Sequence, residues 1–193
     1  MIKEAIEFIV QKLTDTNLFE KVYSQVELVT NSDNKTIPAI YISNGKYKPI
    51  EYSANNGTAY FRKNGKITIV ETESQNYVGC ESFYQITIPL KLVVYKKKNK
   101  LPIDCSYTED LLAETIIAYL SNNLVGWKGT INAQRFSIEF TSIDTDSLAV
   151  WNEETNNVEQ GDINYDIACV SFEVSLIIIA NKKCLTDMCN IEN

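Results

Sequence analysis

The sequence contains no histidine among its 193 residues. This absence removes the commonest general base, the commonest protein metal ligand and the usual partner of a nucleophilic serine or cysteine. An enzyme without histidine has to depend on carboxylates, lysines, tyrosines or a bound metal. We therefore expect that the protein is not an enzyme and that it holds no catalytic residues, no metal and no cofactor.

Glycine-rich phosphate-binding loops are also missing. The seven glycines are scattered singly, and none of the motifs GxGxxG, GxxxxGK[ST] and GxSxG occurs. The tripeptide 144–146 (DTD) has a superficial likeness to a calcium loop, but it lacks the glycine and the distal glutamate at their proper spacing. More carboxylates follow in the same polar stretch: Glu153, Glu154, Glu159, Asp162 and Asp166. Paired carboxylates can hydrolyse glycosides, but a polar stretch such as 144–162 is more typical of a solvated connection.

Closely spaced cysteine pairs are absent. The five cysteines are Cys80, Cys105, Cys169, Cys184 and Cys189, and none of them forms a CxxC motif. Four-ligand zinc sites usually contain such pairs, so the spacing disfavours zinc. An odd number of widely spaced cysteines predicts reduced thiols, and we expect about five free thiols per chain.

Long apolar runs are absent as well. The longest, Val174–Ala180, is far too short to span a bilayer. Charged residues follow Met1 where a secretory signal would need an apolar segment. We expect a soluble protein that is made in a cytoplasm and does not bind a membrane.

The composition is otherwise that of an ordinary globular chain. It is 45% hydrophobic, and its 25 acidic and 18 basic residues give a net charge of −7. Such a charge argues against a general nucleic-acid binder, although it does not exclude a protein that surrounds DNA without gripping it. We predict one α+β domain over residues 1–182, followed by a polar C-terminal tail over 183–193.

Two segments carry the periodicity of a helix. Apolar residues recur at three- and four-residue steps over 2–13, and a turn cluster over 14–17 ends this segment. A second stripe lies in 106–121, where Ser106 and Glu109 have capping-box spacing and Thr108 is an alternative cap. Both stripes predict helices that pack on a sheet.

Strand patterns fill most of the remaining chain. We expect strands over 22–29, 36–43, 58–62, 66–72, 83–95 and 136–141, and a long central strand over 163–180. Asn44-Gly45 predicts a turn, the stretch 46–57 a loop, and Asn64-Gly65 a hairpin between the strands on either side of it. Pro89 predicts a bulge or an edge within a half-buried strand. The predicted fold is therefore a mainly antiparallel, strand-rich sheet, curled or sandwich-like, with two helices on one face.

Tyrosine is abundant, with eleven in the chain, and seven of these fall in or near the strands of the first half. Tyrosine is favoured in strands and is also enriched at protein interfaces. The dense basic run 96–100 contains Lys96, Lys97, Lys98 and Lys100. We predict a loop there, which is either a solvated loop or a contact loop for an acidic partner or a neighbouring subunit.

The order of these elements resembles small bacteriophage neck and tail-completion proteins, in particular the ring-forming tail-terminator type. The resemblance rests on the segments EAIEFIVQKL, TIPAIYISNGKYKPI, TEDLLAETIIAYLSNN and CVSFEVSLIIIA, taken in this order. It is one of pattern over most of the chain, and the Asn/Lys-rich insertions and the polar tail depart from it.

The resemblance implies a structural homo-oligomeric ring in the neck or tail of a virion, in contact with neck, portal and tail proteins. DNA would pass through such a ring without specific binding, and the family brings no catalytic residues. The alternative is a β-rich carbohydrate- or ligand-binding module.

Overall fold

The computed structural model describes residues 2–50, 57–73, 82–100, 108–123, 129–131, 134–155 and 167–181. Its helices are α1 (Ile2–Asp15), α2 (Thr108–Asn123) and α3 (Ser147–Thr155), with a short 3-10 helix, η1, at Lys98–Lys100. Its strands are β1 (Lys21–Thr30), β2 (Thr36–Ser43), β3 (Lys46–Pro49), β4 (Thr58–Lys63), β5 (Thr68–Glu73), β6 (Ser82–Lys97), β7 (Gly129–Ile131), β8 (Gln134–Asp144) and β9 (Ile167–Asn181). The predicted tail, 183–193, lies outside the described residues.

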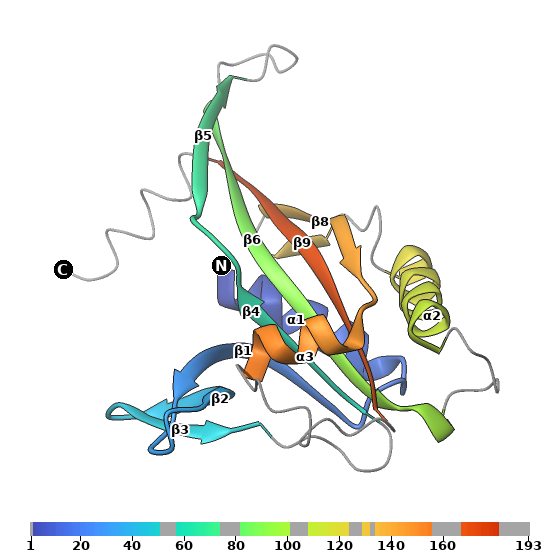
Figure 1. The fold of residues 1–193 in the computed structure, drawn as a ribbon. Coiled ribbons are helices and arrows are strands. Elements are labelled where there is room, and N and C mark those ends of the chain that lie inside the picture. Colours follow the sequence, from blue (N-terminus) through green and yellow to red (C-terminus); the bar gives the residue numbers. More distant parts are fainter. Residues whose placement is uncertain are drawn as a thin grey trace.

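The nine strands form one open, mostly antiparallel sheet, which confirms the predicted fold class. The strand order is β3-β2-β1-β4-β6-β9-β8-β7, with β5 paired to β6 beside this path. Among the described strands, β1 and β4 are the one parallel pair. The long strands β6 and β9 run side by side through the middle of the sheet (Figure 1). Strand β9 is central as predicted, but it is covered on both faces only over Ala168–Phe172. Over Glu173–Ala180 buried and partly exposed residues alternate, and Ile179 is 41% exposed, so the predicted cover on both faces is wrong for this second half.

One face of the sheet carries the larger apolar core. Even-numbered residues of β6 pair with even-numbered residues of β9, for example Leu92 with Phe172 and Leu90 with Val174. Successive residues of a strand point to opposite faces, so these pairs share one face. There they pack with the apolar stripes of α1 and α2. The two predicted helices therefore cover the same face of the sheet.

A third helix, which the sequence analysis missed, covers the opposite face. Helix α3 lies across the front of β6 in Figure 1, whereas α1 lies behind the sheet. Val150 and Trp151 of α3 pack there with Tyr60, Val93 and Tyr95. The prediction of a solvated connection over 144–162 is thus wrong for the stretch 147–155. The half-buried pattern predicted for β6 is confirmed over Ile86–Leu90, where buried and partly exposed residues alternate. It is wrong over Lys91–Tyr95, because Val93 and Tyr95 are buried beneath α3.

The Asn64-Gly65 segment does not form the predicted hairpin. Strands β4 and β5 both pair antiparallel with β6, β4 at Leu90–Tyr95 and β5 at Ser82–Thr87, so they follow one another along the same edge. Residues 64–67 lie opposite residues 88–89, which makes a bulge at Pro89. Gly65 has φ +137°, and a Cβ there would lie 3.0 Å from Pro89 Cγ. The glycine therefore permits close approach to the proline. The prediction that the Pro89 strand has a bulge or runs on an edge is wrong, because β6 is central and Pro89 pairs in register with Ser175 of β9; the extra residues lie in the neighbouring segment 64–67.

The β2–β3 hairpin begins as predicted and then continues beyond the prediction. Asn44 and Gly45 both have positive φ, 50° and 72°, as a tight hairpin turn requires. The chain then returns as β3, in register with β2 from Ala39 opposite Pro49 to Tyr41 opposite Tyr47. The predicted loop over 46–57 is thus wrong for Lys46–Pro49, while 51–56 lie outside the described residues.

Candidate functional site

The most highly organised group of polar side chains lies between α3 and the sheet. Glu154 of α3 is 0% exposed, and Lys91 of β6 is also buried. The Arg62 side chain of β4 completes the cluster together with Glu153 and the phenol of Tyr60. The neighbouring carboxylates Glu153 and Glu154 were predicted to be solvated, and for Glu154 that prediction is wrong.

Each charged group in this cluster contacts groups of opposite charge. The Arg62 Nε donates to both carboxylate oxygens of Glu154, at 2.9 and 3.1 Å, and its Nη2 lies 2.7 Å from Glu153 Oε1. Lys91 Nζ donates to Glu153 and lies 3.9 Å from Glu154 Oε1. The Tyr60 hydroxyl donates to Glu154 at 2.7 Å. Two carboxylates therefore face two cations, as buried charges require.

The electrostatics of the cluster follow from these contacts. Burial by itself would lower the pKa of the Arg62 guanidinium, but the hydrogen bond and charge of Glu154 outweigh burial and raise it. Burial would likewise raise the pKa of Glu153, but the hydrogen bond and charge of Lys91, together with Arg62, lower it. These pairings favour the ionised forms of Arg62 and Glu153. These residues attach α3 to the sheet.

A second polar network joins η1, α2, α3 and β9. Lys98 Nζ lies 2.9 Å from Glu109 Oε1, and the Ser147 hydroxyl donates to the same carboxylate oxygen at 2.9 Å. The Cys169 backbone N–H donates to Ser147 Oγ at 2.9 Å. Burial by itself would raise the pKa of Glu109, but the hydrogen bonds from Lys98 and Ser147 lower it. Glu109 thus contacts neighbouring elements, and Ser106 of the predicted capping box lies outside the described residues.

The acidic residues before α3 cap this helix. Asp146 Oδ1 accepts from the backbone N–H groups of Leu148 and Ala149, at 3.0 and 3.1 Å, as an N-cap residue does. Asp144 Oδ1 accepts from the Asp146 N–H at 2.9 Å. Within the described ranges no group of three or more His, Cys, Asp or Glu side chains is placed to hold a metal ion. Asp146 followed by the apolar residues of 148–151 was the sequence signal that would have revealed α3.

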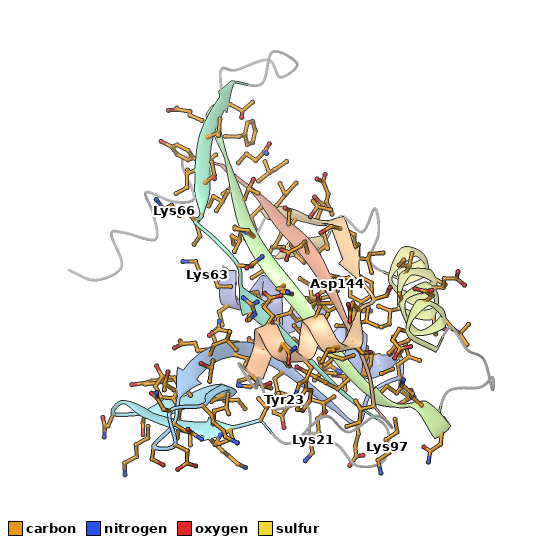
Figure 2. The ribbon with its side chains drawn as sticks, viewed as in Figure 1. Lys21, Tyr23, Lys63, Lys66, Lys97 and Asp144 are labelled. Carbon is orange, nitrogen blue, oxygen red and sulfur yellow. The ribbon has the colours of Figure 1, made fainter. Side chains whose placement is uncertain are left out.

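The basic run 96–100 is not the loop that was predicted. Lys96 and Lys97 end β6, and Lys98–Lys100 form η1. Lys96 Nζ donates to the Leu18 carbonyl at 2.8 Å and lies 5.9 Å from the Phe19 ring centroid. Burial lowers the pKa of this ammonium group. Because Lys96 and Lys98 make contacts within the chain, the predicted partner contact depends more on Lys97, which lies at the lower end of the sheet in Figure 2. The side chain of Lys100 lies outside the described residues, and the partner-contact role stays a prediction.

Large apolar side chains are exposed on two peripheral parts of the sheet. On the β2–β3 hairpin, Tyr41 is 51% exposed and Ile42 is 60% exposed, and on β5 Ile69 and Val70 are 61% and 52% exposed. Tyr41 and Tyr47 stack edge to face across the hairpin, with 5.4 Å between ring centroids. The hydrogen bond that Tyr47 donates to Glu27 raises the pKa of the phenol. These surfaces are the candidate assembly surfaces of the chain.

A shallow groove of about 360 Å³ lies between α1 and the β1–β2 pair. Its walls include Glu7, Gln11, Tyr23 and Gln25, which offer carboxylate, amide and phenol groups. The groove is a surface feature that would suit the alternative of a ligand-binding module. Figure 2 shows Tyr23 near the lower end of the sheet.

Comparison with known proteins assigns no family to this fold. No protein-family model matches the chain, and no curated protein sequence matches it. Among the described helices, none is long and apolar enough to cross a membrane. Function therefore has to be argued from the chain's own surfaces.

Proposed function

We propose that this chain is a structural protein that assembles with copies of itself into a ring in the neck or tail of a bacteriophage particle. Portal, neck and tail proteins are its proposed neighbours, and DNA passes through the ring without specific binding. The exposed apolar side chains at two separate places of an open sheet carry this proposal. Isolated exposed apolar residues are common, but here they occur in pairs: Tyr41 and Ile42 on β2, next to the end strand β3, and Ile69 and Val70 on β5, which pairs only with β6 among the described strands.

Two further observations support assembly over catalysis. The best-organised polar cluster is occupied by its own ion pairs and attaches α3 to the sheet. The order of helix, strands, helix and closing strand resembles tail-terminator proteins. The net charge of −7 agrees with a channel that lets DNA move, because a protein that neutralises many phosphates holds nucleic acid tightly.

The experiment that tests this function measures assembly directly. Light scattering after size-exclusion chromatography, at rising protein concentration, is expected to show a species of several chains, and negative-stain images are expected to show closed rings. Some rings form only on the particle, so the same chain is also sought in purified virions by mass spectrometry. A protein that stays monomeric at high concentration and is absent from particles contradicts the proposal.

The groove between α1 and β1 supports a second candidate, a carbohydrate- or ligand-binding module. It predicts binding on a glycan array that is lost in Tyr23→Ala and kept in Tyr41→Ala. If glycan binding is found together with a monomeric wild-type protein, the second candidate replaces the first.

A further inference from the structure

The groove beside α1 lies where strand β1 has a neighbour on one side only. Strand β1 pairs with β2 over Glu27–Thr30, opposite residues 36–39. With β4 it pairs over Lys21–Tyr23 and again at Val26, with a shift of register between these two contacts. Among the described strands, β4 is therefore the one partner of the stretch before Glu27. In Figure 1, β1 curves away from the sheet toward β2 and β3.

The residues that line the groove show that it follows the edge of β1. Four consecutive residues of the strand, Val22–Gln25, line it. Successive side chains of a strand point to opposite faces, so a hollow on one face would be lined by every second residue. Contact with all four residues places the groove along the backbone edge. Val10 and Gln11 of α1 and Ile40 of β2 complete its walls.

Backbone groups of β1 are turned toward this groove. The Glu20 N–H donates to the Gly57 carbonyl at 3.1 Å, on the β4 side of the strand. Backbone groups alternate between the two edges of a strand, so those of Val22 face β4 and those of Tyr23 face the groove. Strand β2 does not reach them, because beyond Ala39 it pairs with β3 and not with β1. Such an edge is a template for an added strand.

We propose that the groove is a docking site for an extended peptide arm of another protein, which adds to β1 as a further strand. The site goes beyond the proposed ring, and it gives the groove a ligand class other than carbohydrate. In strand addition, backbone hydrogen bonds supply the affinity, and pockets for alternate side chains supply the specificity.

The walls of the groove define the chemistry of the arm. Val10, Val22 and Ile40 are half-buried and suit an apolar side chain. Gln11, Ser24 and Gln25 offer amide and hydroxyl groups to a polar one. The arm that fits therefore alternates apolar residues with uncharged polar residues.

A second copy of this chain offers no described strand that fits the groove. Every described strand already pairs with at least one neighbour, which it would have to bring with it. A groove of about 360 Å³ between α1 and β2 admits a single strand. The arm is therefore a segment of a different protein that is extended and unpaired before it binds.

Synthetic peptides test the site. The probes are short acetylated and amidated peptides in which Val, Ile or Leu alternates with Ser, Thr or Gln. On binding, the amide chemical shifts of ¹⁵N-labelled protein are expected to change at Val22–Gln25 and Ile40, and the Tyr23 amide is expected to gain protection from hydrogen exchange. Each probe is also made in two forms, N-methylated at every second residue in either register. One form is expected to lose binding and the other to keep it, because only one edge of the arm pairs with β1.

A pair of matched variants tests the location. Gln11→Trp fills the groove and is expected to weaken peptide binding at least about tenfold. The control Gln85→Trp makes the same change at an exposed position of β6 and is expected to bind as the wild type does. Urea unfolding verifies that both variants fold, and the shift map of the wild type does not depend on either.

Four outcomes overturn the proposal. The first is that no probe shifts Val22–Gln25, or that the shifts are confined to another edge such as β3 or β5. The second is that both N-methylated forms bind as well as their parent. The third is protection of the Tyr23 amide in the assembled wild type without peptide, which would make the occupant a second copy. The fourth is glycan binding that Gln11→Trp abolishes. None of the four decides whether the ring forms, which light scattering and imaging test separately.

Discussion

The two faces of the central sheet are held by different chemistry. Toward α1 and α2, β6 and β9 place apolar residues opposite apolar residues, such as Leu92 opposite Phe172. Toward α3, the same two strands place Lys91 opposite Glu173 and Tyr95 opposite Cys169. One face is an apolar core, and the other combines a small apolar cluster with buried ion pairs.

This difference assigns different tasks to the two faces. Apolar burial is non-directional and grows with the area removed from water, so the α1–α2 face supplies most of the stability. Ion pairs are directional, and a buried charge is costly when its partner is lost. Helix α3 has nine residues, and a helix of this length is marginal by itself in water. We infer that the ion pairs determine where this short helix lies on the sheet.

The largest effect is expected from a cavity on the apolar face. Phe172 is fully buried and meets Phe140 edge to face, with 5.8 Å between ring centroids. Replacing it by alanine is expected to lower the free energy of unfolding by about 3–5 kcal/mol. Urea unfolding followed by circular dichroism measures the loss. The matched control Ile69→Ala, at an exposed position, is expected to change it by less than about 0.5 kcal/mol. Equal losses in both variants would contradict the assigned core.

A slightly smaller effect is expected on the charged face. Glu154→Gln leaves Arg62 and Lys91 with one carboxylate between them, and we expect a loss of about 3 kcal/mol. Its neighbour Glu153 is about half exposed, so Glu153→Gln is expected to cost less than about 1 kcal/mol. The fluorescence of Trp151 in a Trp127→Phe background reports whether α3 leaves the sheet. Equal losses in the free energy of unfolding for the two substitutions, with unchanged Trp151 emission in both, would contradict the assigned role of Glu154.

Lowering the pH distinguishes the charged contacts from the apolar core. The folded protein holds the pKa values of Glu153 and Glu109 below their unfolded values. Their contribution to stability is therefore fully present above the unfolded pKa of about 4.3 and is lost as the pH falls through the folded pKa. The free energy of unfolding is expected to fall below about pH 5, and this part of the fall is expected to be smaller in the E109Q/E153Q variant. An unchanged pH dependence in that variant would show that other carboxylates cause it.

A smaller effect separates the lysines of the basic run. Lys96→Ser removes the hydrogen bond to the Leu18 carbonyl and is expected to cost about 1 kcal/mol. Lys97→Ser is expected to leave the free energy of unfolding unchanged and to weaken assembly, and added salt is expected to mimic that weakening. If Lys97→Ser assembles normally at every salt concentration, the predicted partner contact is wrong.

The smallest effect is expected at Cys169, whose thiol is predicted not to react with a thiol reagent in the folded protein. This thiol is free and buried, and burial raises its pKa well above the ordinary value. The reactive species is the thiolate, so Cys169 is expected to resist a thiol reagent in the folded protein. Under denaturing, non-reducing conditions about five thiols per chain are expected to react. A denatured count near one would indicate two disulfides.

Local patterns predicted much of the secondary structure. The apolar stripe of α1 and the alternation in β8 match their elements, because each has a period that one structure satisfies. Strand β9 was recognised instead from its length and its β-branched residues. The turn at Asn44-Gly45 followed from the positive φ that these residues accept. The fold class followed from the same patterns.

The wrong predictions concern residues whose local sequence is compatible with two different structures. Asn64-Gly65 suits a hairpin turn, but in the fold it makes a bulge beside Pro89, because β4 and β5 share one edge of β6. Glu153 and Glu154 look solvated in the sequence, and only their approach to Arg62 and Lys91 makes a buried place for Glu154. The candidate assembly surface was visible only as an abundance of tyrosine.

The sequence by itself determined the absence of histidine chemistry, the periodicities of the main helices and strands, and the turn at Asn44-Gly45. The tertiary structure decided which strands stand at an open edge, which carboxylates are buried and which lysines point outward. The physical reason is the distance along the chain over which each effect acts. Periodicity and turn geometry act over a few neighbouring residues, whereas burial and ion pairing depend on residues that are distant in the chain, as Arg62 and Glu154 are.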